Sequence, residues 1–164
     1  MTESRLSIRW AVATDDAALL TLDQSAWTSE AGFPSMQTAS RTTFFNERAI
    51  PDIHLVAELD GQLVGYLRLK DKYPFVEGAG ILAINGFAVA PAARRLGVGK
   101  ALLDAAEAEG KRRGARKLTL NVFDTNTAAR RLYERQGYTI VGRARDEFLI
   151  DGRYVDDLSL AKVL

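Results

Sequence analysis

The 164-residue sequence predicts an α/β fold of the α+β kind, with a mixed, mostly antiparallel sheet of about seven strands flanked by helices. Three observations predict it. Apolar residues alternate with polar ones at the spacing of half-buried strands. Two Asp-Gly pairs, Asp60-Gly61 and Asp151-Gly152, separate such stretches and favour tight hairpin turns. A helical stretch between the apolar segments 81–89 and 118–122 implies that these two strands, the fourth and fifth, run parallel.

The first half of the chain predicts two helices and three strands. Leu6, Ile8 and Trp10 alternate with polar residues, as in a strand with one buried face. Thr14 precedes two acidic residues and is therefore typical of a helix start. The expected elements are a strand at 6–12, a helix at 15–27, a loop at 28–37, a helix at 38–49 that ends before Pro51, and strands at 53–59 and 63–69.

The second half predicts two helices among four strands. Apolar residues recur at helical spacing after Pro91, and Gly114 is placed to end that helix. The expected elements are a strand at 81–89, the helix between Pro91 and Gly114, a strand at 118–122, a helix at 126–136, and strands at 138–150 and 152–162.

Composition narrows the functional classes. The length fits a single domain over residues 1–164, and there is no repeat or linker. The chain has no cysteine and a single histidine, His54, so we expect no disulfide and no metal. A net charge of +1 gives no overall attraction to nucleic acid or to membranes. No apolar stretch has the length of a membrane span, and the cytoplasm is the expected compartment.

The most informative segment, residues 89–100, lies between a buried strand and an amphipathic helix. It contains Arg94-x-x-Gly97-x-Gly99, and two glycines allow an anion to approach the backbone closely. The N–H groups that begin a helix favour a phosphate. The spacing differs from both the dinucleotide fingerprint and the P-loop. A plain flexible turn is the alternative, and the position between strand and helix favours a phosphate site.

A second motif runs from Asn126 through Leu132-Tyr133 to Gly137-Tyr138. With the first motif it resembles the GNAT superfamily of N-acetyltransferases, over about residues 80–140. The resemblance implies a GNAT acyltransferase-like fold and acetyl-coenzyme A as co-substrate. It implies that the backbone of the 95–100 turn binds the pyrophosphate and that the strand ending at Val89 binds pantetheine. The expected cofactor-binding residues are Phe87, Ala88, Val89, Arg94, Arg95, Leu96, Gly97, Val98, Gly99, Lys100, Asn126 and Tyr133.

The resemblance also gives Tyr133 a catalytic role, with its hydroxyl near the thioester sulfur. A departing thiolate needs a proton or a hydrogen bond, and we expect Tyr133 to act mainly as a hydrogen-bond donor. A core tyrosine and, for Asn126, a helix N-cap are the structural alternatives. Many relatives carry a carboxylate base where this chain has Asn85 and Gly86. The identity of the general base is therefore undecided. The amine could lose its proton to water or to one of five side chains: Glu77, Glu147, Asp146, Asp157 and His54.

The expected function is direct transfer of an acetyl group to a primary amine in a ternary complex, without an acyl-enzyme. A non-catalytic acyl-coenzyme A-binding or regulatory module is the alternative, because the strand-four carboxylate is missing. Three aromatic residues, Trp27, Phe33 and Tyr73, are candidates to line the pocket of a small-molecule or peptide amine acceptor. The basic segment 111–117 is expected to be solvated rather than to bind nucleic acid. An exposed final strand would allow a homodimer.

Overall fold

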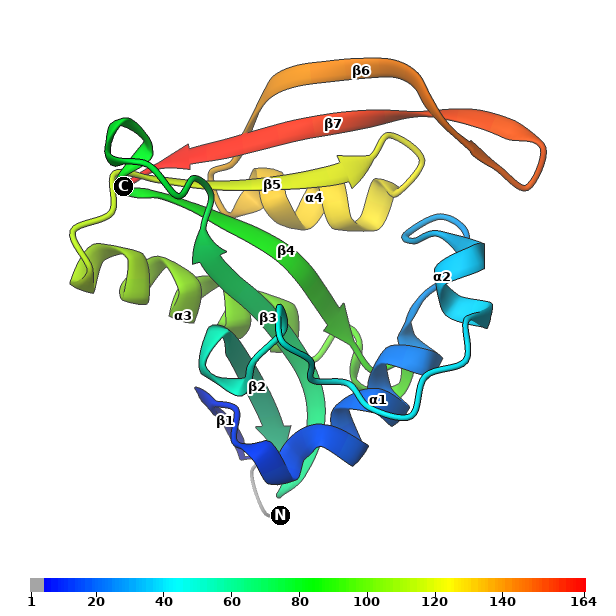
Figure 1. Cartoon of the computed structure of the whole chain (residues 1–164), viewed down its shortest axis with the longest axis vertical. Coiled ribbons are helices and arrows are strands. Elements are labelled where there is room, and N and C mark those ends of the chain that lie inside the picture. The colour runs from blue at the N-terminus through cyan, green and yellow to red at the C-terminus, as the bar shows by residue number, and fades with distance from the viewer. Residues whose placement is uncertain (1–4) are drawn as a thin grey trace.

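The computed structural model describes residues 5–164, and Figure 1 shows a single twisted sheet with helices on both of its faces. The strands are β1 (Leu6–Trp10), β2 (His54–Leu59), β3 (Gln62–Asp71), β4 (Ile81–Val89), β5 (Lys117–Phe123), β6 (Thr139–Ile150) and β7 (Arg153–Val163). The helices are α1 (Asp16–Ala26), α2 (Pro34–Thr38), α3 (Val98–Arg112) and α4 (Thr127–Arg135).

The sheet has the strand order β1-β2-β3-β4-β5-β7-β6, and β4 and β5 are its parallel pair. The other neighbouring strands are antiparallel. The two Asp-Gly turns connect β2 to β3 and β6 to β7, with positive φ at both residues of each turn, as a type I′ turn requires. The predicted fold class, including the parallel pair, is therefore confirmed.

The two faces of the sheet are covered by different helices. On one face α3 and α4 pack over a core that includes Leu67, Leu102, Leu120 and Tyr133. On the other face α1 packs against β3 and β4 through a smaller apolar cluster that includes Tyr66. The strand residues alternate between these two cores, which is the two-residue period that the sequence displays. We call the second face, with α1 on it, the α1 face.

A bulge in β4 divides the sheet. Leu67 pairs with Phe87 and Leu69 pairs with Ile84, so two residues of β4, at 85 and 86, lie opposite one residue of β3. Such a two-against-one arrangement bends the bulged strand. The pairing of β4 with β5 ends at Ile84, which lies opposite Leu120. Beyond this point the backbones of the two strands diverge, as Figure 1 shows, and we call the region between them the opening.

The prediction of a helix at 38–49 is wrong. The short helix α2 begins earlier, with Pro34 in its first turn, and residues 39–50 contain bends, one turn and an isolated bridge between Asn46 and Ala49, but no helix. The backbone N–H groups of Phe44 and Phe45 both donate to Oδ1 of Asp16, at 3.0 and 2.8 Å. The Phe44 side chain is buried in the cluster under α1. A long-range contact thus replaces the helical hydrogen bonds that local periodicity predicts.

Candidate functional site

The opening between β4 and β5 is lined by backbone groups of β4. Ala90 N donates to Val64 O of the β3 side over 2.7 Å. Since successive strand residues direct their backbone groups to alternate sides, those of Ala88 also face β3. The backbone groups of Phe87 and Val89, which the resemblance implies would bind pantetheine, then face the opening. Ala88, predicted with them, contributes its side chain to the apolar cluster of the α1 face.

The turn before α3 presents a run of backbone N–H groups. Arg95 and Gly97 have φ of 64° and 80°, and the first hydrogen bond of the helix joins Ala101 N to Gly97 O. Within residues 5–164, none of the N–H groups from 95 to 100 has a protein acceptor. Alternating right- and left-handed residues at a helix N-terminus form an anion-binding concavity. The turn therefore suits a pyrophosphate.

The two glycines of this turn have different reasons to be there. A Cβ on Gly97 would meet no atom within 4 Å, so its positive φ is what favours glycine. A Cβ on Gly99 would lie 3.1 Å from Leu132 and 3.4 Å from Phe87. Gly99 thus allows α3 to approach α4 and β4. Only Gly97 borders open space, whereas the sequence argument assigned both glycines to the anion.

The basic side chains near the turn have different surroundings. Arg94 donates from Nη2 to the carbonyl oxygen of Ala26, the last residue of α1, over 2.8 Å. Lys100 forms an exposed ion pair with Asp104 at 2.6 Å, and such pairs contribute little and exchange readily. Arg95 is exposed and has no ion-pair partner in the described part of the chain. Arg95 and Lys100 are therefore the accessible cations. The backbone N–H groups of Leu96 and Val98 lie between them in the chain.

The helix α4 carries Asn126 at its N-cap and Tyr133 about two turns further along. Asn126 caps the helix by accepting the Ala129 N–H on its side-chain oxygen at 3.2 Å. Its side-chain nitrogen has no acceptor among residues 5–164. The cap and the predicted contact with pantetheine therefore use different atoms. The Tyr133 ring lies with its centroid 6.1 Å from that of Phe87 of β4.

The Tyr133 hydroxyl is positioned as a hydrogen-bond donor. The side chain is buried, and its hydroxyl has no protein partner in the described chain. Burial raises the pKa of Tyr133 well above its usual value, so the phenol stays protonated. The Tyr138 hydroxyl also lacks a partner, but it is sealed in the core. A ligand atom in the opening would supply the partner that Tyr133 lacks.

Trp27 and Phe33 form part of a segment that crosses the opening. Trp27 Nε1 donates to Asp23 over 2.6 Å, which fixes the ring beside α1. Phe33 packs edge-on against Phe123 of β5 and Phe148 of β6, with centroid distances of 5.2 and 4.8 Å. Residues 27–33 thus connect the α1 face near β3 to the ends of β5 and β6. The sequence names both residues as candidates to line the acceptor pocket.

Tyr73 does not join Trp27 and Phe33. It stacks on Phe75 in the loop before β4, with centroids 5.2 Å apart. This loop lies where β4 and β5 are still paired, away from the opening and from α2 (Figure 1). Tyr73 instead borders a small cavity of about 70 Å³ with Asn121 and Ser159. The sequence could not separate these locations because all three residues lie in loops or at helix ends.

The single histidine is fully buried beneath the α1 face. His54 Nδ1 lies 2.7 Å from Ile50 O, and Arg68 Nε lies 3.1 Å from His54 Nε2. A neutral imidazole satisfies both contacts by donating from Nδ1 and accepting at Nε2. Burial lowers the pKa of His54 to about 4, so it is neutral at physiological pH. With both nitrogens occupied, His54 has no free nitrogen to accept a proton from a substrate.

Among the candidate bases, Asp157 lies nearest to the end of the β4–β5 pairing. It pairs in register with Phe123 of β5 and accepts a hydrogen bond from Asn121 Nδ2 over 2.8 Å. Glu77 lies in the 72–80 loop, and Asp146 and Glu147 lie on β6, one strand further out. Asp157 is thus the carboxylate best placed on the α1 face beside the opening.

A polar network under α1 was not anticipated from the sequence. The Asp23 carboxylate accepts hydrogen bonds from Trp27, from Arg41 at 2.6 Å and from Tyr66 at 2.5 Å. The only sequence signal is that Tyr66 and Arg68 alternate with Leu67 and Leu69 in β3. Polar residues inside a central strand indicate a face that is used for more than packing.

Comparison with known proteins assigns the chain to a family. The model of the acetyltransferase (GNAT) family matches residues 17–138, well over half of the sequence. The chain therefore belongs to the GNAT acetyltransferase family, as the two sequence motifs indicate. Among residues 5–164, no helix is long and apolar enough to cross a membrane. The same residues contain no cluster of His, Asp or Glu side chains suited to a metal ion.

Three relatives illustrate the similarity. An uncharacterized N-acetyltransferase of Bacillus subtilis, YhfO, is 38% identical over 84 residues, covering 51% of this chain and 56% of that protein. The chain thus spans little more than half of this curated relative. The crystal structure of smu.2055 from Streptococcus mutans has a TM-score of 0.80 at 25% identity, covering 97% and 98% of the two chains. The yncA acetyltransferase from Salmonella typhimurium, solved with acetyl-CoA, has a TM-score of 0.75 at 21% identity and shares the fold over 98% and 95%.

Proposed function

We propose that this protein, as a single domain over residues 1–164, transfers the acetyl group of acetyl-coenzyme A to a primary amine in a direct ternary complex. The observation that carries the proposal is the run of unpaired backbone N–H groups from 95 to 100 at the end of the opening. These groups and the exposed Arg95 and Lys100 fit a pyrophosphate. Family membership supports the same co-substrate.

The route of the pantetheine arm follows from the unpaired strand edge. Phe87 and Val89 offer backbone donors and acceptors along the opening, and Asn126 offers its side-chain amide from the other side. An amide-rich arm can pair with these groups as an added strand would. Such binding directs the thioester toward Tyr133. We predict that neither this binding nor the acetyl transfer involves a metal ion.

The proton balance can be assigned to named atoms. The amine nitrogen bonds to the carbonyl carbon, the carbon–sulfur bond breaks, and the thiolate accepts a hydrogen bond from the Tyr133 hydroxyl. An amine that arrives as an ammonium ion first loses one proton to Asp157, directly or through water. The second proton, which the nitrogen loses as the amide forms, passes to the thiolate, which leaves as a thiol. Tyr133 keeps its proton, because its raised pKa makes full transfer to a thiolate unfavourable. Its role is to stabilise developing charge.

The test combines calorimetric titration with acetyl-coenzyme A and a thiol-release assay on a panel of primary amines. We expect one binding site per chain and thiol release only when an amine is present. Incubation without an amine should give no stoichiometric burst of thiol, because no acyl-enzyme forms. Binding without amine-dependent release would favour a non-catalytic acyl-coenzyme A module, for which the lack of a carboxylate at Asn85 and Gly86 is the argument. No binding would refute the proposal.

A further inference from the structure

An unbalanced positive charge lies on the α1 face beside the opening. Arg68 of β3 is half-buried and lies opposite the bulge formed by Asn85 and Gly86. A Cβ on Gly86 would lie 3.3 Å from Arg68 Cβ and 3.7 Å from Arg68 Nε. The guanidinium is therefore next to a stretch of β4 that carries no charge of its own.

A hydrogen bond to the buried His54 fixes the orientation of the Arg68 side chain. The Arg68 Nε group donates to His54 Nε2 over 3.1 Å, and the imidazole is held in turn by Ile50 O. A fully buried neutral imidazole is a rigid acceptor, so Nε of the guanidinium is committed to the protein interior. The two terminal nitrogens of Arg68 have no acceptor within residues 5–164.

The carboxylate of Asp23, in the same polar network, already has other hydrogen-bond partners. The Tyr66 hydroxyl is surrounded by the charges of Asp23, Arg41 and Arg68. Asp23 accepts from Trp27 and Tyr66 and forms an ion pair with Arg41 at 2.6 Å, and Arg68 is not among its partners. Around the Tyr66 hydroxyl there is thus one carboxylate for two guanidinium groups. A partly buried charge of this kind is usually paired, and since residues 5–164 supply no acceptor to its terminal nitrogens, an anion of a bound ligand can pair with it.

The Arg68 guanidinium lies close to the edge of β4 where we expect the acceptor amine to react. Adjacent strands are about 4.8 Å apart, so an anion on Arg68 would lie within a few ångströms of the β4 edge that faces the opening. The α1 segment with Trp27 encloses the same face. An amine reaching the opening from this side would therefore bring the substituents next to its nitrogen beside Arg68.

We propose that Arg68 binds a carboxylate of the acceptor, so that the substrate is an amino-acid-like amine whose carboxylate lies close to the reacting nitrogen. This inference rests on the proposed function. The planar guanidinium edge matches a carboxylate in a bidentate pair. One unbalanced positive charge also matches a monoanion, whereas a phosphate monoester carries about −1.5 to −2 at pH 7. A phosphate-bearing amine is therefore the alternative that the test must separate.

The experiment measures kcat/KM by thiol release for matched amines. Each L-amino acid is compared with its carboxamide and with its decarboxylated amine, and O-phosphoethanolamine is compared with ethanolamine. We expect at least one amino acid to exceed both neutral counterparts by about 10-fold or more, the range in which one charge-assisted pair discriminates. Preference for the phosphorylated amine alone, or no preference for an anion, would overturn the assignment to a carboxylate.

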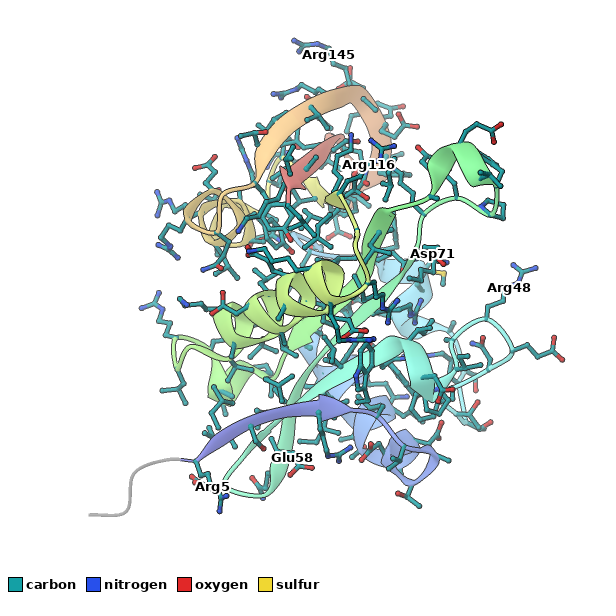
Figure 2. The ribbon with its side chains drawn as sticks, turned by 90° about the vertical axis from the view of Figure 1, so that its left-hand side faces the viewer. Arg5, Arg48, Glu58, Asp71, Arg116 and Arg145 are labelled. Atoms are coloured by element: carbon teal, nitrogen blue, oxygen red, sulfur yellow. The ribbon has the colours of Figure 1, made fainter. Side chains whose placement is uncertain are left out.

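Variants test whether Arg68 is the source of the preference. Arg68→Gln should abolish it by raising KM for the amino acid while leaving the neutral amines unchanged, and Arg68→Lys should retain part of it. Arg48→Gln is the matched control, because Figure 2 shows the exposed Arg48 side chain projecting away from the body of the protein. Equal losses for charged and neutral amines in Arg68→Gln would contradict the proposal.

Two readouts separate failure of this inference from failure of the proposed function. If acetyl-coenzyme A binds and neutral amines are acetylated as well as amino acids, only the carboxylate assignment is overturned. If acetyl-coenzyme A does not bind, the proposed function fails. If acetyl-coenzyme A binds but no amine reacts, the carboxylate assignment is tested by titrating the coenzyme A complex with amino acids and with their amides. Tighter binding of the acids, lost in Arg68→Gln, supports the inference, and equal binding refutes it.

Discussion

Arg94 Nη2 donates a hydrogen bond to the carbonyl oxygen of Ala26 over 2.8 Å, although the two residues are 68 positions apart. The bond joins the turn that precedes α3 to the last residue of α1, where a cation suits the negative end of the helix. Trp27 follows directly in the chain. The turn assigned to the pyrophosphate is therefore mechanically connected to the segment assigned to the acceptor.

Replacement of Arg94 should affect the acceptor more than the cofactor. In Arg94→Gln the carbonyl of Ala26 loses its donor and α1 loses its anchor, at a cost of about 1.5–3 kcal/mol for a hydrogen bond to a charged group. We expect a raised KM for the amine with nearly unchanged affinity for acetyl-coenzyme A, measured by steady-state kinetics and calorimetry. Arg95→Gln is the paired variant and should show the reverse. If Arg94→Gln chiefly weakens the cofactor, Arg94 binds phosphate instead.

Gly97→Ala should weaken acetyl-coenzyme A binding beyond its effect on stability. The left-handed backbone at φ 80° costs about 1–2 kcal/mol for a residue with a Cβ. Gly114 is a matched control, since it also has a positive φ, 72°, and open space around the position of a Cβ. Thermal unfolding should show similar losses for Gly97→Ala and Gly114→Ala. Calorimetry should show reduced cofactor affinity only for Gly97→Ala, and equal affinities would argue against the turn.

Tyr133→Phe should lower kcat by about 100-fold, near the lower end of the range for loss of one hydrogen-bond donor to developing charge. The affinity for acetyl-coenzyme A should change little, because the ring remains. Tyr138→Phe removes a hydroxyl that is buried without a partner, and should keep full activity with equal or higher stability. Single-turnover kinetics with saturating acetyl-coenzyme A would separate chemistry from binding. Equal rates for Tyr133→Phe and the native protein would leave only a packing role.

His54 should make the free energy of unfolding depend on pH between about 6.5 and 4. In the unfolded chain the imidazole binds a proton below about 6.5, whereas burial lowers the native pKa to about 4. The unfolded state therefore binds more protons in this window, and stability falls as pH falls. The full difference corresponds to about 3 kcal/mol at 1.36 kcal/mol per pKa unit. His54→Gln should flatten this slope in urea titrations at several pH values, and an unchanged slope would assign it to carboxylates.

Asp157→Asn should lower kcat most at neutral pH. The hydrogen bond from Asn121 can be kept by the amide oxygen, so we expect little change in the melting temperature. If Asp157 accepts the proton of the amine, the deficit should shrink as pH rises toward the pKa of the amine, about 10, because more substrate arrives neutral. A rate–pH profile with a saturating amine measures this. A constant deficit across pH would indicate a structural role.

The parts that the sequence predicts correctly are those with local causes. The Asp-Gly turns require positive φ at both residues, and all four residues of the two turns have it. The strand–helix–strand order between β4 and β5 leaves little choice but a parallel pair. Each of these signals lies within a few residues of the feature that it specifies, and each agrees with the structure.

The parts that it misses depend on residues far apart in the chain. Asp16 holds the backbone at 44–45 and so prevents the helix expected there. The isolation of Tyr73 from Phe33 depends on which loop crosses the opening. The unbalanced charge of Arg68 becomes visible only when Asp23 is seen to bind other partners. No window along the sequence contains these pairs of residues.

The two halves of the sheet share only four paired positions, from Ile81 with Lys117 to Ile84 with Leu120. At the other end, residues 27–33 connect them through the Trp27 contact and the Phe33 packing. The width of the gap is thus set by a surface segment that can tolerate changes in length and composition without disturbing the core. Changes within this one bridging segment should therefore alter which acceptors fit while leaving the turn before α3 as it is.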